Sequence, residues 1–266
     1  MEPEFIGVVG SQGRMGAWLV RLLSQAGLRV RAADLKAGPV NWSWLAECPV
    51  VFLAVPIPAL AEAARNLGPH TREDGVVMDL CSVKEAPVRY MLEHCRGEVA
   101  GCHPLFGPAA AEMKDRLVFV CPGRGRRWLD WWTGFLKVRG ARVVEIMPAR
   151  HDWLMARVQV LRQLALFSFG LSLARLNFDA REDLPLAGPW FSSLLEILGA
   201  QLRQTPELYA DLALSNPEAR PVMEEFARSA GQVSRLVAAG DREALVECLA
   251  EVARRFPHLA GEEGGE

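Results

Sequence analysis

The sequence has no long apolar run, no excess of basic side chains and no closely spaced cysteines. Its uncharged stretches, such as Gln163 to Ala174, are well short of the ~20 apolar residues that a membrane-spanning helix requires. The formal net charge is only −2, whereas binding to a nucleic-acid backbone needs a basic surface. These absences predict a protein that neither crosses a membrane nor binds nucleic acid.

The cysteines and the N-terminus carry no motif of their own. The cysteines are scattered, with no CxxC pair and no His/Cys cluster at metal spacing, so we expect reduced, mostly buried thiols and no metal site. The acidic start "MEPEF" runs directly into an apolar segment and shows neither a signal peptide nor a transit peptide. This favours a cytoplasmic location. The six cysteines are Cys48, Cys81, Cys95, Cys102, Cys121 and Cys248.

The first half of the chain alternates short Val-rich runs with amphipathic stretches. The runs are "FIGVV", "LRVRAA", "VVFLAV", "GVVMDL", "EVAGC", "LVFVC" and "ARVVEI". Strands that alternate with helices predict a Rossmann-type, doubly wound parallel sheet covered on both faces by helices. We therefore expect an α/β domain over residues 1–147.

After Met147 the Val-rich runs stop and helical patterns continue to Phe256. Prolines fall where helices can begin or end, at Pro189, Pro206, Pro217 and Pro221. We expect an all-helical domain over residues 148–258. The Gly- and Glu-rich end, residues 259–266, is predicted to be a disordered tail.

One helical segment is apolar on more than one face. Its apolar residues cannot all point into one core from a single helix stripe. They are Leu164, Leu166, Phe167, Phe169, Leu171 and Leu173. A second copy of the chain packed against this helix would bury them, so we expect a homodimer through the helical domain. The alternative is that surrounding helices of the same chain bury them.

A glycine-rich turn follows the first Val-rich run, in "VVGSQGRMG". Gly10, Gly13 and Gly16 stand between a predicted strand and a predicted helix, where glycines let the backbone approach a pyrophosphate at the helix N-terminus. The strict GxGxxG pattern would place glycine at Ser11. The predicted cofactor-binding residues are Gly10, Ser11, Gln12, Gly13, Arg14, Met15, Gly16, Asp34, Val55 and Pro56. The alternative is that these glycines only cap a helix.

Asp34 ends the second predicted strand, at the position where an acidic side chain accepts the ribose hydroxyls of a dinucleotide. Because a carboxylate repels a 2′-phosphate, NAD is favoured over NADP. Arg31 and Lys36 keep NADP as the alternative.

Polar residues follow the next three strands, in "AVPIPAL", "DLCSVKEAP" and "GCHPLFGP". Ligands of such a sheet bind beyond the carboxyl ends of its strands. We therefore expect three catalytic residues, Ser82, Lys84 and His103, at one rim. His103 is the candidate general base because imidazole titrates near neutral pH. We expect Ser82 to bond to His103 or substrate, and Lys84 to offer charge to a carboxylate or the cofactor.

With these motifs the chain resembles the prephenate dehydrogenase (cyclohexadienyl dehydrogenase) family. "GARVVEI", "HDWLMA" and "TPELYADL" extend the resemblance in order over nearly the whole chain. The resemblance implies NAD-dependent oxidation of a cyclohexadiene with loss of carbon dioxide, in which hydride leaves ring carbon 4 and His103 takes the proton of the 4-hydroxyl. It also implies that the helical half forms the dimer and one wall of the substrate pocket.

The chain departs from the family where the substrate is held. The family usually has a carboxylate-binding arginine at Ala200, often another at Ser192, and the relative compared has a histidine at Gln163. Loss of a charged contact weakens binding unless another cation replaces it. The candidate replacements are Arg157, Arg162 and Arg203. The helical spacing of His151, Met155, Val158 and Arg162 predicts that His151 and Arg162 face the same way, and we expect His151, Arg162 and Gln163 to bind substrate.

Several substrates and functions stay open. Prephenate and 4-amino-4-deoxyprephenate are weighed equally, in aromatic amino acid or aminophenylalanine-derived antibiotic biosynthesis, with arogenate third. A catalytically idle, NAD-binding regulatory homologue is a second class. A 3-hydroxyacid dehydrogenase is a third, but such enzymes usually employ a lysine on the long interdomain helix, and His151 to Arg175 contains none.

Overall fold

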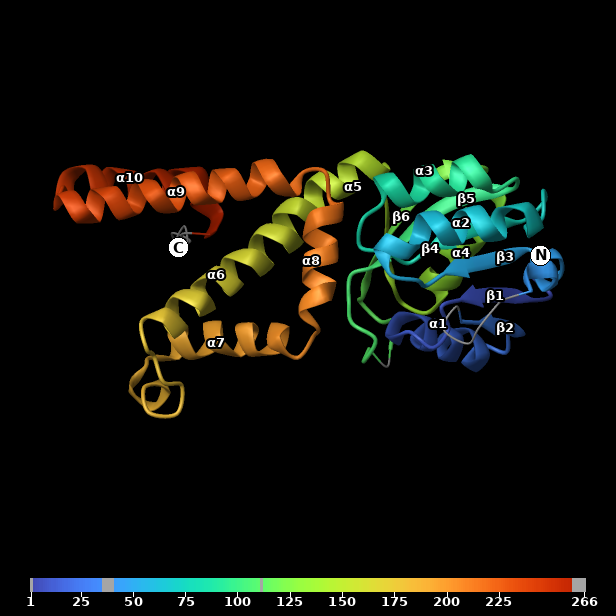
Figure 1. The fold of residues 1–266 in the computed structure, drawn as a ribbon, viewed down its shortest axis with the longest axis horizontal. Coiled ribbons are helices and arrows are strands. Elements are labelled where there is room, and N and C mark those ends of the chain that lie inside the picture. Colours follow the sequence, from blue (N-terminus) through green and yellow to red (C-terminus); the bar gives the residue numbers. More distant parts are fainter. Residues whose placement is uncertain (1, 35–40, 111, 260–266) are drawn as a thin grey trace, which may run out of the picture. The chain divides into compact units, whose positions relative to one another are not determined.

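The computed structural model describes residues 2–34, 41–110 and 112–259 (Figure 1). The chain forms two compact units, Met1–Glu218 and Ala219–Glu266. The boundary predicted after residue 147 falls within the first of these units. Residues 148–218 belong to the first unit because α8 (Pro206–Ser215) packs against η3 (Ile57–Ala59), which follows the third strand.

The first unit is built on one sheet, and all seven Val-rich runs form its strands. The strands are β1 (Ile6–Val9), β2 (Val30–Ala33), β3 (Val50–Leu53), β4 (Val76–Asp79), β5 (Glu98–Pro104), β6 (Leu117–Arg124) and β7 (Arg142–Glu145). They lie in the order β2-β1-β3-β4-β5-β6-β7. Neighbouring strands are parallel except β5 and β6, which pair antiparallel. The Rossmann-type fold is confirmed, and the sheet departs from the predicted parallel arrangement only at this pair.

The reversal at β6 has a local cause. A parallel connection needs a crossover, usually a helix. The described part of the segment between Pro104 and Leu117 contains no helix, so the chain turns back directly beside β5. Because β6 and β7 are parallel to each other, both run opposite to the first five strands.

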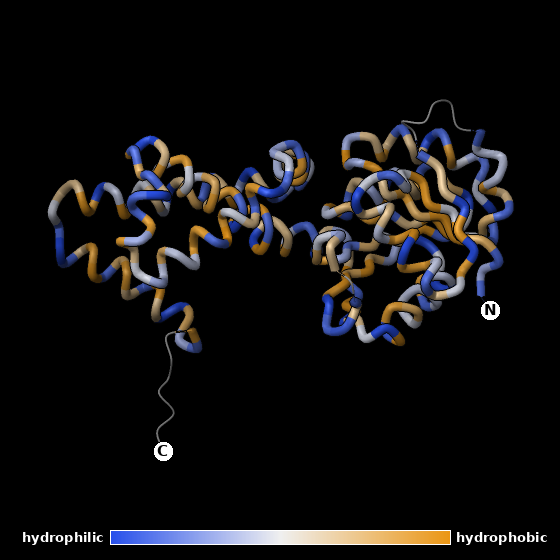
Figure 2. The backbone as a smooth tube through the Cα atoms, turned by 90° about the horizontal axis from the view of Figure 1, so that it is seen from below, coloured by the Kyte–Doolittle hydropathy of each residue, from blue (hydrophilic) through white to orange (hydrophobic). Residues whose placement is uncertain are grey.

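Helices cover both faces of the sheet, as predicted. Side chains alternate along each strand, so Val8 and Phe52 pack with α1 and α4, whereas Val9 and Val51 pack with α2 and α3. In Figure 2 the strands form an apolar centre with more polar segments around it. These helices are α1 (Arg14–Gln25), α2 (Leu60–Leu67), α3 (Glu85–His94) and α4 (Arg127–Val138), with short turns η2 (Trp42–Glu47) and η4 (Gly68–His70).

A helical segment completes the first unit. α5 (Pro148–Met155) and α6 (Arg162–Arg175) are joined by η5 (Ala156–Leu161), a π-helical stretch. A π-helix changes the phase of the residues beyond it, because its turns hold more residues than α-helical turns. The remaining elements are η6 (Leu184–Leu186), α7 (Pro189–Leu202) and α8. Pro189 and Pro206 begin α7 and α8, which confirms two of the predicted helix starts.

The second unit is a pair of helices, α9 (Ala219–Ala239) and α10 (Arg242–Arg255), followed by η7 (Pro257–Leu259). Asp241 caps α10 by accepting a hydrogen bond from the Ala244 N–H at 3.0 Å. Of the predicted tail, Leu259 ends η7 and residues 260–266 lie outside the described residues. Across the described residues, no helix is long and apolar enough to span a bilayer.

Candidate active site

The glycine turn between β1 and α1 is built for close approach of backbone. Gly10 has φ +86°, and a Cβ there would lie 2.5 Å from the Ala54 carbonyl oxygen. A Cβ on Gly16 would lie 2.1 Å from the carbonyl oxygen of Gly10. Side chains are therefore excluded at both positions. The turn leaves the α1 N-terminus uncovered by bulky groups, which fits a bound dinucleotide.

Asp34 lies against this turn. The backbone N–H of Gln12 donates to its Oδ2 at 3.0 Å, which places the carboxylate beside the glycines. Arg31 is held by Glu47 at 2.5 Å and lies over the ring of Phe5. Lys36, the other residue that favours NADP, lies outside the described residues. Among the described residues beside the glycine turn, the site thus has the Asp34 carboxylate and an arginine, Arg31, that is already paired with Glu47.

A pocket of about 570 Å³ lies beside the glycine turn, between the ends of β4 and β5 and the helices α6, α7 and α8. Met15, in the first turn of α1, lines it, and Arg14 donates a hydrogen bond to Gln204 next to it. The polar side chains that line the pocket are Ser82, His103, Gln159, Arg162, Gln163, Gln201, Gln204 and Tyr209. The predicted rim and the helical half therefore meet at one pocket, and Ala200 lines it as well.

His103 lines this pocket, is 3% exposed, and stands at the end of a series of hydrogen bonds. Its Nδ1 lies 2.9 Å from Nε2 of His151, and Nδ1 of His151 lies 2.7 Å from Oδ1 of Asp152. The Asp152 carboxylate also accepts the backbone N–H groups of Lys84 and Glu85, at 2.7 and 2.9 Å. Asp152 is thereby fixed as an acceptor.

The Asp152 carboxylate sets the direction of each hydrogen bond in this series. Because Asp152 accepts, His151 carries its proton on Nδ1 and accepts on Nε2, and His103 must then donate from Nδ1. This assignment leaves Nε2 of His103 as an unprotonated acceptor. The Nε2 amide group of Gln159 approaches that nitrogen at 3.5 Å. His103 thus lines the pocket as a neutral imidazole whose Nε2 can accept a proton.

Burial keeps both imidazoles uncharged in the resting protein. Burial lowers the pKa of His103 well below 6.5, and His151 and Lys84 lower it further. Burial also lowers the pKa of His151, although its bond to Asp152 opposes the shift. Both rings are neutral at pH 7, which is the state a general base needs.

Lys84 lies beneath the rim and does not face the pocket. Its side chain is fully buried, and its ammonium donates to Asp79 and, at 3.0 Å, to the Cys102 carbonyl oxygen. Burial alone would lower the pKa of Lys84, but Asp79 outweighs it and raises that pKa. A Cβ on Gly101 would meet Cδ of Lys84 at 2.7 Å, so glycine leaves room for the lysine. The ammonium of Lys84 is thus paired with Asp79 and is not turned toward the pocket, where it was expected to meet a carboxylate or the cofactor.

The structure also places Ser82 and His151. Ser82 lines the pocket but makes no hydrogen bond to His103, whose described partners are His151 and Gln159, so its expected bond to substrate stays a prediction. His151 does not line the pocket, whereas Arg162 does. The π-helical turn between them breaks the 3.6-residue spacing that predicted a shared face.

The other candidate cations are placed differently from Arg162. Arg157 stacks on Trp153 at 3.8 Å and pairs with Glu218 at 3.9 Å. Arg203 is exposed and is not among the residues that line the pocket. Of the described residues, Arg162 is the arginine or lysine that lines it, and Gln163 lies next to it there.

Sequence reasoning missed three residues of the site: Asp79, Asp152 and Gln159. Asp152 directly follows His151 in "HDWLMA", and Asp79 stands five residues before Lys84 in "DLCSVK". A carboxylate beside a candidate histidine or lysine was the available signal. Gln159 had none, because the π-helical turn brings it toward His103.

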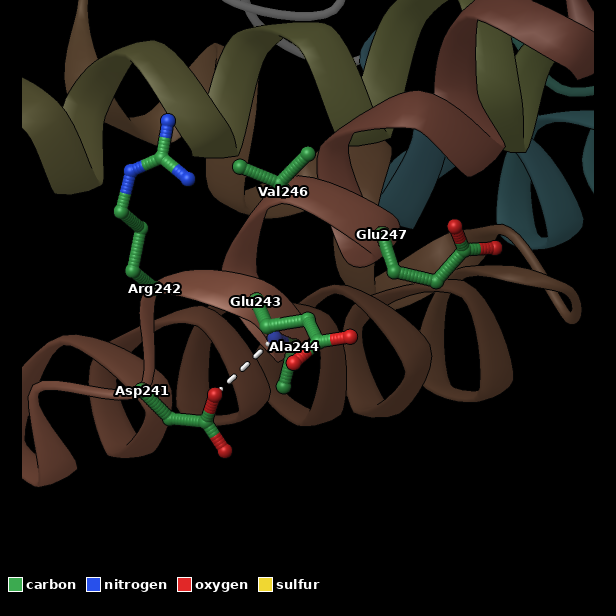
Figure 3. Close-up of a pocket in the computed structure, with 6 residues that line it drawn as sticks. All are labelled: Asp241, Arg242, Glu243, Ala244, Val246 and Glu247. Carbon is green, nitrogen blue, oxygen red and sulfur yellow. Dashed lines mark hydrogen bonds between the residues drawn. The ribbon is translucent and has the colours of Figure 1, made fainter.

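A second hollow, of about 490 Å³, lies in the second unit at the start of α10 (Figure 3). Its acidic cap, Asp241, is engaged by the Ala244 N–H, and the other lining residues show no base or nucleophile arrangement. In the parts of the chain that the structure describes, no group of three or more His, Cys, Asp or Glu side chains is placed to hold a metal. All six cysteines are free and five are buried, as predicted.

Two family models match the chain. "Prephenate dehydrogenase, nucleotide-binding domain" matches residues 22–145, and "Prephenate dehydrogenase, dimerization domain" matches residues 147–251. Among solved structures, prephenate dehydrogenase from A. aeolicus in complex with hydroxyphenyl propionate and NAD+ has a TM-score of 0.73 at 22% identity, over 97% of this chain and 99% of that one. This likeness shows the shared fold.

Curated relatives agree with the family models. A probable arogenate/prephenate dehydrogenase from Methanocaldococcus jannaschii is 31% identical over 94% of this chain and 60% of its own length. A T-protein from Enterobacter agglomerans is 31% identical over 94% of this chain and 66% of its own length, so this chain spans about two thirds or less of both. A 4-amino-4-deoxyprephenate dehydrogenase from Streptomyces pristinaespiralis is 33% identical over 98% of this chain and 92% of its own length. The resemblance seen in the motifs is confirmed, and the chain belongs to the prephenate dehydrogenase family.

Proposed function

We propose that the protein catalyses NAD-dependent oxidative decarboxylation of a prephenate-type cyclohexadiene. The observation that carries this proposal is the imidazole of His103, which lines a pocket beside the glycine turn and is bonded through Nδ1 to His151. A base with that orientation suits removal of a proton from a substituent whose carbon gives up hydride. Membership of the prephenate dehydrogenase family supports the same reaction.

The glycine turn holds the cofactor in this proposal. Gly10, Gly13 and Gly16 let the pyrophosphate rest on the N-terminus of α1, and Asp34 receives the ribose hydroxyls. NAD is the cofactor, since a carboxylate at Asp34 repels a 2′-phosphate. When bound, NAD supplies the acceptor for the hydride of ring carbon 4. The other residues predicted for this site are Ser11, Gln12, Arg14, Met15, Val55 and Pro56.

Residues of the chain have separate tasks in the reaction. His103 takes the proton from the substituent on ring carbon 4, and Ser82, which lines the same pocket, bonds to that substituent. Arg162 binds a substrate carboxylate, and Gln163 lies beside it. The buried pair of Lys84 and Asp79 positions the end of β5. Loss of carbon dioxide makes the ring aromatic and draws the reaction forward.

The substituent on ring carbon 4 is proposed to be a hydroxyl or an amine. The relative from Streptomyces pristinaespiralis, named for the amino substrate, matches 92% of its own length, which supports that substrate. The relatives named for prephenate and arogenate support the others. One assay decides among them: NAD or NADP reduction with prephenate, arogenate and 4-amino-4-deoxyprephenate side by side. Absence of turnover with all three, despite NAD binding measured by calorimetry, would favour an idle regulatory homologue.

Arg162 provides a test of the substrate side. Arg162→Gln should raise KM by about 10- to 100-fold and change kcat much less, because a charged hydrogen bond to a carboxylate contributes about 1.5–3 kcal/mol. Arg203→Gln is the matched control, since Arg203 is an exposed arginine outside the pocket lining. Steady-state kinetics with each substrate measures both. Equal KM values in the two variants would remove Arg162 as the anchor.

The assembly is part of the same proposal. A homodimer through the helical half would cover apolar side chains that are exposed in the single chain, among them Leu171 at 52% and Trp190 at 91%. The match to a dimerization-domain model supports this partner. We keep the boundary after residue 147 and the cytoplasmic location as predictions within this proposal.

A further inference from the structure

We infer that His103 does not keep the proton it removes but passes one inward, so that the positive charge comes to rest on His151 against the Asp152 carboxylate. The inference rests on the proposed function for the source of the proton. It assigns His151 and Asp152 as positioning residues, because neither lines the pocket.

The geometry provides a continuous path. A proton arrives at Nε2 of His103, which faces the pocket, and the proton on Nδ1 of the same ring is 2.9 Å from the acceptor Nε2 of His151. His151 is bonded to Asp152 at 2.7 Å, and Asp152 is held by two backbone N–H groups of α3 and its N-cap, Lys84. All hydrogen bonds of this series point from His103 toward Asp152, so the transfer needs no rotation of a ring.

The balance of bonds is complete. The O–H or N–H bond of the ring substituent breaks, and its electron pair becomes the second bond between the substituent and ring carbon 4 as hydride leaves that carbon. An N–H bond forms at Nε2 of His103, the N–H bond at Nδ1 of His103 breaks, and one forms at Nε2 of His151. After carbon dioxide leaves, the proton returns by the reverse path to the aromatic oxygen or nitrogen. The pair of His103 and His151 therefore holds one proton during decarboxylation.

The surroundings favour charge on the inner ring. His103 faces His151 and Lys84, both of which disfavour its protonation, and it has no carboxylate partner among the described residues. Burial and Lys84 also lower the pKa of His151, but the carboxylates of Asp152 and Asp79 oppose that shift. Phe119 packs edge-on against His151 with ring centroids 5.4 Å apart, and His151 is fully buried. An imidazolium there is stabilised by a desolvated carboxylate that water does not screen.

Nuclear magnetic resonance can test the resting chain without any substrate. The protein has five histidines, and His→Gln variants assign their ¹⁵N resonances. We expect His103 and His151 to carry their protons on Nδ1, and Asp152→Asn to alter both spectra. His94→Gln, a histidine outside the pocket, is the control. A proton on Nε2 of His103 in the wild-type protein would overturn the relay, whether or not the proposed reaction is correct.

Kinetics of His151→Gln tests the transfer itself. We expect kcat to fall by about 10²–10⁴-fold, with KM and the calorimetric Kd for NAD within about threefold of wild type. The pH profile of kcat/KM should also change, because the wild-type profile reports the coupled pair and the variant reports His103 alone. Wild-type kcat with an unchanged pH profile would contradict the relay. A wild-type protein that reduces NAD with none of the three substrates would instead refute the proposed function.

Discussion

Replacing His103 with asparagine is expected to lower kcat by about 10²–10⁴-fold while NAD affinity stays nearly unchanged, because a general base contributes about that factor. Asparagine keeps a polar side chain of similar reach but cannot take a proton. His103 is not among the residues that hold the cofactor in the proposal, so cofactor binding should survive.

Two measurements separate this effect from a loss of structure. Single-turnover kinetics reports the chemical step, and calorimetry with NAD reports the glycine turn. His94→Asn is the matched control, since His94 ends α3 away from the pocket lining. A His103→Asn protein with wild-type kcat would remove the histidine from the mechanism.

Replacing Lys84 with methionine is expected to lower the free energy of unfolding by about 3–5 kcal/mol, because it leaves the Asp79 carboxylate buried without its cation. Both side chains are fully buried, and Oδ1 of Asp79 has no hydrogen-bond partner among the described residues. After the substitution, Oδ2 keeps the Cys81 N–H at 2.8 Å as its described partner. The remaining carboxylate would therefore be poorly compensated.

The loss should depend on pH. Burial raises the pKa of Asp79, and removal of Lys84 takes away the cation that opposes this shift. Below the pKa of the buried carboxyl the group is neutral and its burial costs less, so the destabilisation should shrink as pH falls. Addition of Asp79→Asn to Lys84→Met should recover part of the lost stability at neutral pH.

Denaturant unfolding of the variants measures both effects. Arg89→Met is the matched control, because Arg89 and Glu93 form an exposed pair, 58% and 51% exposed, on α3. Such a pair contributes about 0–1 kcal/mol. A Lys84→Met protein as stable as the Arg89→Met control would contradict the account of the buried pair.

The sequence predicted the elements of the fold better than their directions. Val-rich runs located all seven strands because both faces of the sheet are covered. The same pattern cannot report direction, so the antiparallel pairing of β5 and β6 was missed. Direction depends on the connection, and the described part of that loop has no helix to carry a crossover.

The site was predictable where it depends on strand ends and not where it depends on side-chain direction. The end of β5 placed His103 correctly at the pocket. Lys84 follows β4 by the same rule, yet its side chain turns beneath Gly101 to Asp79, whereas Ser82 faces the pocket. Position along a strand end fixes the backbone and leaves the direction of the side chain to tertiary contacts.

Contacts across the chain decided the remainder. His151 lies 48 positions after His103 in the sequence, yet the two rings are bonded. Asp152, next to it on α5, bonds to the N-cap of α3. The π-helical turn η5 then directs Gln159 toward His103 and moves Arg162 to a face that His151 does not share. A π-helical turn depends on tertiary packing, and a search for a 3.6-residue period in the sequence does not detect it.

The central claim is that this pocket couples oxidation of ring carbon 4 to loss of the ring carboxylate. The most direct measurement is the yield of ¹³CO₂ against NADH, with prephenate and 4-amino-4-deoxyprephenate that carry ¹³C in the ring carboxylate. The account predicts equal amounts of the two products with at least one substrate. NADH formed without ¹³CO₂, or no NADH with either substrate, would contradict it.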